Sequence, residues 1–372
     1  MAPLLTDEWT LGSLRVPNRV MLAPLAGIGN WFVRLQAKRY GAGMAVSEMV
    51  SSHAIHHRNA RTCEELLRID PREREAGASG AGGIVSIQLF GADARVMRSA
   101  AARAAEAGAD AIDLNMGCPV PKVCKTGAGA ALLDDHERAL AVARAAIQGS
   151  GLPVTVKLRS GQRPGERSGI DLARRLVEDA GVAAIALHPR SAAVRHSGSP
   201  DYELAGELAG RLGAPLILSG GLRDRDGILA AFATSGASAV MLARGALGNP
   251  WLFTQLLGGN GEPGSAEPDA AEPSVDEVKA ELRWMVARAC EHLGRERATR
   301  WMRKAYPWYI ARLRLPKPAA KALQESLQRA ATLAEADELL ERATTSSGNA
   351  SGDDAHCIGG ESPRYTPALA TA

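Results

Sequence analysis

The chain has 372 residues, of which 46% are hydrophobic and 23% charged, a composition typical of a soluble globular protein. Its length allows one large domain and a smaller one. No apolar run approaches the roughly 18 residues of a membrane span, and no basic segment leads into an apolar one at the N-terminus, so we expect a cytoplasmic protein that does not contact membranes. The five scattered cysteines indicate reduced thiols rather than a disulfide framework or a metal site.

The formal net charge of +3 is unevenly distributed along the chain. Residues 278–345 contain 14 Lys and Arg against 8 Asp and Glu, a local charge of +6 that leaves −3 for the remainder. This asymmetry indicates that the C-terminal part meets a polyanionic partner.

Eight short apolar runs follow one another through the first two-thirds of the chain. Most are separated by Ala-rich segments of helical spacing, which is typical of parallel strands covered by helices. Eight such units in about 250 residues predict a closed (β/α)8 TIM barrel, an α/β fold. A doubly wound open sheet is the alternative, but no Gly-x-Gly-x-x-Gly follows the first strand. The predicted strands span 20–24, 44–50, 84–90, 111–115, 154–158, 184–188, 216–220 and 239–243.

The composition changes after the barrel, which we assign to residues 1–257. Residues 258–273 are rich in Gly, Pro and acid and predict a linker. A small all-helical domain is expected over 274–345, beginning with a capping box of Ser274 and Glu277 and continuing into two helical segments, one interrupted at Pro307. Residues 346–372 predict a disordered tail, and residues 71–83 a loose loop.

Functional side chains of such barrels gather at the carboxyl ends of the strands. After the fourth strand comes Gly117-Cys118-Pro119, where Gly allows a sharp turn and Pro stiffens the exit, so the thiol is held on a rigid corner. The thiol either meets a substrate there or packs as a small hydrophobe. The strand-end residues are Pro24, Leu25, Ala26, Ser47, Glu48, Gln88, Asn115, Cys118, Lys157, Arg159, His188, Arg190, Ser219, Gly220, Gly221 and Arg244.

Several stretches together resemble the tRNA-dihydrouridine synthases of the bacterial branch that joins an FMN barrel to a small helical domain. The resemblance runs from about Leu11 to Leu315, and its most specific part is NMGCP followed by a lysine strand and a phosphate-binding last strand. The matching stretches are NRVMLAPLAGIGN, AVSEMVSS, VSIQLFG, IDLNMGCPVPKV, GAGAALL, VTVKLRSG, LHPRS, MLARGALGNPW and RKAYPWY.

The resemblance implies that FMN, reduced by NADPH or NADH, gives a hydride to C6 of a tRNA uridine while Cys118 delivers a proton to C5. The uridine must leave its stack to reach such a pocket. Lys157 would stand beside N1 and O2 of the flavin, and Gly220 and Arg244 would hold its phosphate. Residues implied at the substrate are Asn115, Arg190, Arg303 and Lys304, and residues implied at the cofactor are Pro24, Leu25, Ala26, Gln88, Lys157, His188, Ser219, Gly220, Gly221, Ala243 and Arg244.

The chain departs from the family pattern at a few positions. Ser219 and Gly221 stand where the family usually has Asn and Asp, and Ala243 stands where it has Gly. Cys124 and Ala305 replace an Asn after the catalytic loop and a His of the helical domain. Backbone amides hold a phosphate without side chains, so FMN binding is expected to survive. Two alternatives stay open: an FMN barrel acting on a small enone or on dihydroorotate, and an inactive RNA-binding homologue.

Residues 295–321 are predicted to form the main tRNA-binding surface. Nine Lys and Arg fall there against a single acid, Glu296. Four aromatic residues lie among these cations and suggest base stacking, namely Trp301, Tyr306, Trp308 and Tyr309. The uridine position, the choice between NADPH and NADH and the oligomeric state are not decided by the sequence, although a monomer is favoured and no metal is expected.

Overall fold

A computed structural model describes residues 3–76, 83–258 and 272–348. The chain divides into two compact units. Most of the predicted linker and of the predicted tail lies outside the described residues. The first unit is Met1–Ala246 with Leu252–Ala270, and the second is Leu247–Trp251 with Ala271–Ala372.

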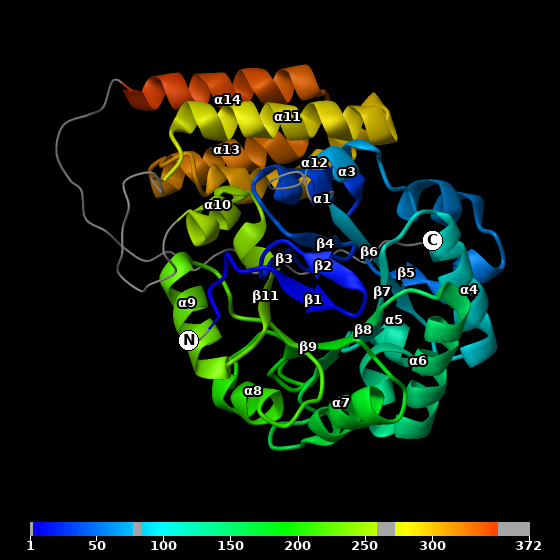
Figure 1. Cartoon of the computed structure of the whole chain (residues 1–372). Coiled ribbons are helices and arrows are strands. Elements are labelled where there is room, and N and C mark those ends of the chain that lie inside the picture. Colours follow the sequence, from blue (N-terminus) through cyan, green and yellow to red (C-terminus); the bar gives the residue numbers. More distant parts are fainter. Residues whose placement is uncertain (1–2, 77–82, 259–271, 349–372) are drawn as a thin grey trace. The chain divides into compact units, whose positions relative to one another are not determined.

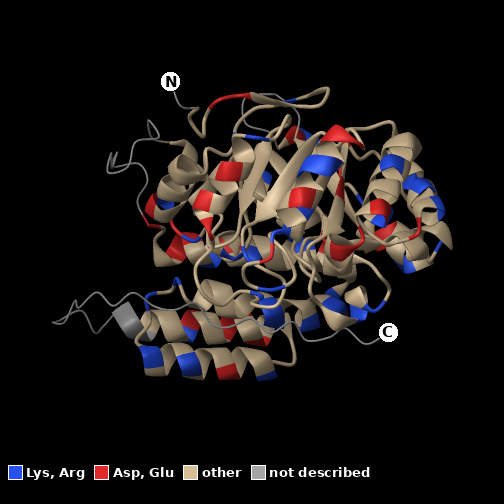
Figure 2. Cartoon of the chain, turned by 90° about the horizontal axis from the view of Figure 1, so that it is seen from below, with Lys and Arg blue, Asp and Glu red and all other residues tan. Residues whose placement is uncertain are grey.

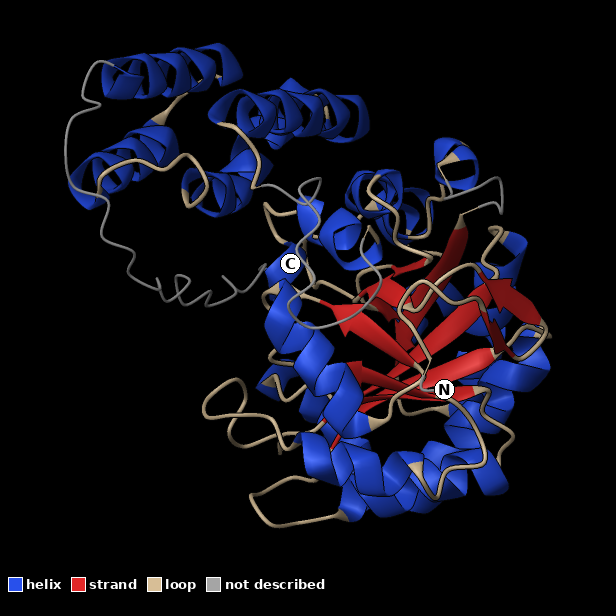
Figure 3. Ribbon diagram, turned by 60° about the vertical axis from the view of Figure 1, so that its left-hand side comes forward, coloured by secondary structure: helices blue, strands red, loops and turns tan. Residues whose placement is uncertain are grey.

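The first unit is a barrel of eight parallel strands surrounded by helices, which confirms the predicted fold (Figures 1 and 3). Each strand pairs with the next around the ring, and the pairing of the second and third strands closes it. The barrel strands are β3 (Val20–Leu22), β4 (Met44–Val46), β6 (Ile84–Phe90), β7 (Ala111–Met116), β8 (Val154–Arg159), β9 (Ala184–His188), β10 (Leu216–Ser219) and β11 (Ala239–Leu242).

Three short strands add to this barrel. The predicted strand 44–50 divides into β4 and β5 (Val50–Ser51), which pairs with the carboxyl end of β6. An N-terminal hairpin of β1 (Trp9–Leu11) and β2 (Leu14–Val16) was not predicted. Trp9 and Val16 join a buried cluster with Ala111, Ala184 and Ala239, the first residues of their strands. The hairpin therefore closes the amino end of the barrel, opposite the end where sites form.

The helices of the first unit begin where the sequence supplies caps. The side chains of Asp93, Asp135, Asp201 and Asp224 each accept a backbone hydrogen bond at the start of a helix. Among the described residues the helices are α1 (Trp31–Arg39), α2 (Ser52–His56), α3 (Arg72–Glu75), α4 (Ala94–Glu106), α5 (Pro121–Cys124), α6 (His136–Ser150), α7 (Ser168–Glu178), α8 (Tyr202–Ala209), α9 (Arg225–Ser235) and α10 (Trp251–Leu257), whose first residue belongs to the second unit, with a π-helix, η1 (Thr62–Leu66), and the short 3-10 helices η3 (Gly129–Asp134) and η4 (Arg244–Ala246).

Helix α3 lies inside the segment that was predicted as a loose loop. Its Glu73 is fully buried and accepts hydrogen bonds from Arg34 of α1, with 2.8 Å from Arg34 Nε to Glu73 Oε2. Lys38 donates to the carbonyl oxygens of Glu73 and Gly83. These contacts order residues 72–75, while residues 77–82 lie outside the part of the chain that is described.

The second unit contains four helices among its described residues: α11 (Val275–Leu293), α12 (Arg295–Ile310), α13 (Lys317–Arg329) and α14 (Leu333–Gly348). The capping box of Ser274 and Glu277 is confirmed. Three helices follow α11 where two were predicted, and α12 runs through Pro307 without a break. Proline removes the donor for the carbonyl of Arg303, and Gln328 Nε2 satisfies that oxygen instead at 2.7 Å. None of the described helices is long and apolar enough to cross a membrane.

Three of the four aromatic residues of α12 do not form a stacking surface. Trp301, Tyr306 and Tyr309 are only 8%, 3% and 1% exposed, because they form the apolar face of α12 inside this unit. The predicted stacking role is therefore wrong for these three residues. Lys and Arg alternate with acidic residues along the helices of the unit (Figure 2), and Lys279 and Arg283 pair with Glu341 and Asp337 of α14. Trp308 is only partly buried, so the predicted tRNA-binding surface depends on charge and on this one aromatic residue.

Candidate active site

Polar side chains from three neighbouring strands meet inside the carboxyl half of the barrel. The strand register places Gln88, Asp113 and Thr155 side by side on β6, β7 and β8. Asp113 is fully buried and accepts hydrogen bonds from Gln88 Nε2, at 2.6 Å, and from Thr155 Oγ1. Asn115 and Lys157 are paired in the same register, two residues closer to the barrel mouth.

Asp113, like Thr155, was not among the strand-end residues predicted from the sequence. Burial raises the pKa of its carboxyl group to about 6, although the hydrogen bonds from Thr155 and Gln88 and the charge of Lys157 oppose the rise. The available signal was a charged residue inside the apolar run AIDLN, at a position that alternation turns into the barrel.

A chain of hydrogen bonds connects this buried carboxyl group to the cysteine corner. Gln88 donates to Asp113 and accepts from Asn115 Nδ2, with 3.0 Å between Asn115 Nδ2 and Gln88 Oε1. Asn115 Oδ1 then accepts from the backbone amides of Cys118 at 2.9 Å and of Gly117 at 3.3 Å. The Asn115 carboxamide therefore holds the turn that carries the thiol.

The corner favours glycine because it lies close against the next strand. A Cβ atom on Gly117 would lie 3.1 Å from the backbone of Leu158 in β8. The carbonyl oxygen of Cys118 accepts from the amide of Ala130 at 3.0 Å and from the thiol of Cys124 at 3.3 Å. Burial raises the pKa of the partly buried Cys118 thiol. A thiol that stays protonated at neutral pH suits an acid rather than a nucleophile.

Arg159 holds the corner from the other side. This residue at the end of β8 is only 4% exposed, and its Nε donates to the carbonyl of Gly117 at 3.1 Å. Its Nη1 donates to the carbonyls of Ser191 and Arg195 at 3.0 and 2.7 Å. One buried guanidinium group therefore joins the cysteine corner to the loop that follows β9.

Lys157 carries a cation into the same space. Its side chain is partly buried, and no hydrogen bond from its Nζ is found among the described residues. Burial and the neighbouring Arg159 lower the pKa of Lys157 to about 8, while Asp113 and Cys118 oppose that change. The group is thus an ammonium ion at neutral pH and lies within the electrostatic reach of Cys118.

The ends of β9, β10 and β11 form a site that suits an anion. Arg190 and Arg244 have no acidic partner in the described part of the chain, and burial lowers the pKa of each. Arg190 Nη1 lies 3.0 Å from His188 Nε2, so His188 accepts this hydrogen bond as a neutral ring. Burial and the surrounding cations lower the pKa of His188.

Two glycines leave open backbone at this place. Gly220 has φ +93°, and a Cβ there would lie 2.2 Å from His188 Cδ2. Gly221 has φ +80°, and a Cβ there would lie 2.4 Å from the Tyr202 hydroxyl oxygen. Cations without acids, beside glycine backbone that no other residue could adopt without collision, suit a phosphate group.

The remaining expected residues fall in two places. Pro24, Leu25 and Ala26 follow β3, where Glu48 Oε2 accepts from the Gly27 amide at 2.8 Å and fixes the loop. Ser219 ends β10, and Ala243 lies between β11 and η4, so both are at the same end of the barrel. Arg303 and Lys304 lie on α12 in the second unit, where Arg303 donates to the carbonyl of Ala330 at 3.2 Å.

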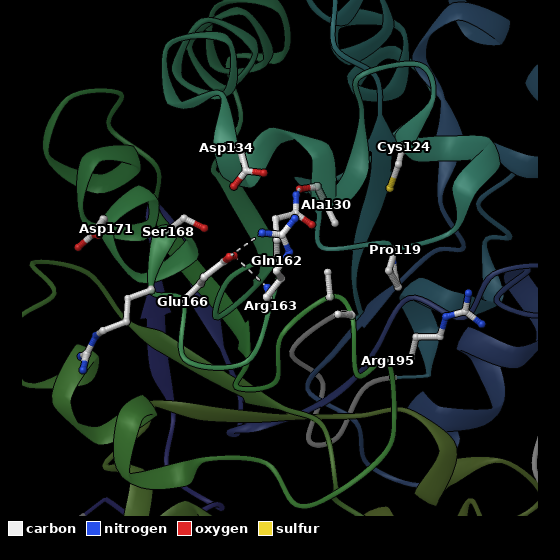
Figure 4. Close-up of a pocket in the computed structure, with 13 residues that line it drawn as sticks. Pro119, Cys124, Ala130, Asp134, Gln162, Arg163, Glu166, Ser168, Asp171 and Arg195 are labelled. Carbon is white, nitrogen blue, oxygen red and sulfur yellow. Dashed lines mark hydrogen bonds and ion pairs between the residues drawn. The ribbon is translucent and has the colours of Figure 1, made fainter.

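A cleft of about 710 Å³ begins beside the cysteine corner (Figure 4). It is lined by the loops that follow β7, β8 and β9, and it includes Pro119, the residue directly after Cys118. Cys124, Gln162, Glu166 and Arg195 are among the other lining residues. The lining is mostly polar, with side chains of both charges.

Comparison with known proteins gives a consistent result. The family model described as dihydrouridine synthase matches residues 21–348. The tRNA-dihydrouridine synthase B of Pseudomonas putida is 32% identical over 81% of this chain and 85% of its own length. A probable tRNA-dihydrouridine synthase of Mycobacterium tuberculosis is 34% identical over 89% of this chain and 84% of its own.

Solved structures with a similar fold share much less sequence. A morphinone reductase has a TM-score of 0.50 at 18% identity, over 73% of this chain and 93% of its own. The old yellow enzyme homologue of Zymomonas mobilis has a TM-score of 0.50 at 18% identity, over 67% of this chain and 90% of its own. This likeness concerns the barrel fold alone.

Proposed function

The chain belongs to the dihydrouridine synthase family, and from this premise we propose that it reduces the C5–C6 double bond of a uridine in tRNA, using FMN and NADPH or NADH. The single observation that carries the proposal is the cysteine corner. A protonated thiol is held there by Asn115 and Arg159, beside Lys157 and an anion site suited to a flavin phosphate.

The residues divide the work between binding and proton transfer. Arg190, Arg244 and the backbone at Gly220 would hold the cofactor phosphate. Lys157 would stabilise the negative charge of the reduced flavin ring. A bound flavin would supply the hydride for C6. Cys118 is the catalytic acid that would protonate C5, and its fixed corner removes the need to orient a free acid.

Asn115 has a double assignment in this proposal. Its Oδ1 holds the amides of Cys118 and Gly117, and its Nδ2 donates to Gln88. We therefore assign it to holding the acid, in addition to the contact with uracil that the family resemblance implies. Gln88 likewise joins Asn115 to the buried carboxyl of Asp113, whether or not it also reaches the flavin ring.

The test uses purified protein with FMN, NADPH and an unmodified tRNA transcript. We expect yellow protein and a mass increase of two hydrogens in one or more uridines, located by fragment mass spectrometry. Yellow protein that reduces a simple enone but leaves every uridine unchanged would instead support a small-molecule reductase. Colourless protein that binds tRNA would support the inactive homologue.

A further inference from the structure

The loop that follows β9 is fixed from two sides although it lies at the surface. Arg159 donates to its carbonyls at Ser191 and Arg195, and Arg190 donates to its carbonyl at Gly198. The amides of Ala192 and Ala193 donate to the segment after β8 at 2.8 Å each. The loop therefore has a defined position, in contrast to a surface loop held only at its ends.

Arg195 occupies an unusual backbone position in this loop. Its φ of +52° is in the left-handed region, which costs a non-glycine residue roughly 1–2 kcal/mol. The hydrogen bond of 2.7 Å from Arg159 Nη1 to its carbonyl helps to hold this conformation. The same Arg159 side chain also holds Gly117, so the place of Arg195 relative to the cysteine corner is set by one buried residue.

The guanidinium group of Arg195 is exposed and has no acidic partner among the described residues. It lines the cleft on the side of Pro119 and Cys124, and Asp171 and Ser168 line the opposite side (Figure 4). Two other arginines of the cleft are already paired, Arg163 with Glu166 and Arg167 with Glu207. Arg195 is thus the arginine of the cleft that is left to meet an anion from outside.

We propose that Arg195 binds a backbone phosphate of the tRNA next to the uridine that is reduced, an inference that rests on the proposed function. A nucleotide turned out of its stack carries its own flanking phosphates to the mouth of the pocket. Phosphate contacts of this kind set the register of a nucleic acid without reading its bases. Because Arg159 joins Arg195 to Gly117, the contact would align the uridine with the thiol.

The experiment measures tRNA binding by holoenzyme at several salt concentrations, together with dihydrouridine formation and flavin reduction by NADPH. For Arg195→Ala we expect tRNA affinity to fall about tenfold, and the slope of log affinity against log salt to decrease in magnitude by about 1. Flavin reduction should be unchanged. Arg195→Lys should keep the salt slope while losing part of the tRNA affinity. Lysine keeps the charge but lacks the planar guanidinium group that can donate two hydrogen bonds to one phosphate.

Arg163→Ala is the matched control, since it removes a cation of the same cleft that is paired within the chain. Wild-type affinity and salt slope in Arg195→Ala, or an equal loss in Arg163→Ala, would overturn the assignment. If the wild-type protein bound tRNA but formed no dihydrouridine, the proposed function would fail while the salt slopes still decided the role of Arg195.

Discussion

The carboxyl end of the barrel and the C-terminal helical unit both gather cations, but they hold them in different ways. In the barrel, Arg159 and Arg190 are 4% and 8% exposed, and Arg244 has no acidic partner in the described residues. In the helical unit, Arg283 and Arg300 pair with Asp337 and Glu296 on a solvated surface. Burying unpaired cations is costly, whereas solvated pairs cost little.

Because of this difference, the two groups of cations are not equally strong evidence for a bound ligand. Buried cations that are held by carbonyl oxygens but have no acidic partner favour an anionic ligand, so the barrel mouth is well suited to bind an anion. A surface group is compatible with water alone, so the charge excess of residues 295–321 is weaker evidence for RNA. Substitutions in each region test this difference.

The largest effect should come from Cys118→Ala. We expect dihydrouridine formation to fall by on the order of 100- to 10,000-fold, the usual contribution of a positioned acid, with FMN binding and flavin reduction nearly normal. Single-turnover assays with tRNA and stopped-flow reduction by NADPH measure the two steps separately. Cys124→Ala is the control and should keep most activity, because its thiol only donates to the Cys118 carbonyl. If both variants remain active, the acid is another group.

The next effect concerns the anion site. Gly220→Ala should weaken FMN binding at least about tenfold, because the new Cβ would collide with the His188 ring at 2.2 Å. Gly236→Ala is matched to it, since Gly236 also has positive φ, +54°, but nothing lies within 4 Å of its added Cβ. Fluorescence titration with FMN measures both. Equal FMN affinities in the two variants would show that Gly220 is required for the backbone conformation and not for FMN binding.

A smaller effect is expected from Lys157→Met in protein without FMN. The folded-state pKa of about 8 lies below the unfolded value, so the unfolded chain binds more protons and the charged lysine destabilises the fold. The penalty is fully present below pH 8 and disappears toward about pH 10.4. The variant should therefore melt a few degrees higher at pH 7, and the gain should shrink as the pH rises through that interval.

Thermal scans across this range give the result, with Lys122→Met, an exposed lysine near the corner, as the control. The same Lys157 variant, loaded with FMN, should be reduced more slowly by NADPH. A variant with unchanged melting and unchanged reduction would mark Lys157 as a solvated rim residue.

The smallest effect belongs to the helical unit. Replacing Lys317 and Lys321 of α13 by Ala should lower tRNA affinity a few-fold and reduce the salt slope by up to about 2, with FMN binding unchanged. Both residues are exposed. Lys279→Ala is the comparison, since Lys279 pairs with Glu341 within the unit. If tRNA affinity does not change when both lysines are replaced, the excess of cations on α12 and α13 is a solvated surface that does not bind tRNA.

The sequence by itself determined the features that depend on neighbours along the chain. The eight strands follow from short apolar runs, the start of α11 from Ser274 and Glu277, and the turn at Cys118 from the Gly and Pro beside it. Each of these rests on local geometry, because a turn or a cap is built within a few residues. The motif around Cys118, together with the lysine strand and the last strand, also indicated the family.

Only the tertiary structure decided which distant groups meet. Gln88 and Asp113 are 25 positions apart, and Arg159 reaches the carbonyl of Gly117 across 42 positions. Tertiary packing also buries Tyr306 and Tyr309. It brings Gln328 to the carbonyl oxygen of Arg303, which has no backbone donor because of Pro307. Such contacts depend on barrel closure and helix packing, which bring together residues that are far apart in the sequence. The local sequence around one residue does not indicate which distant residue it will contact.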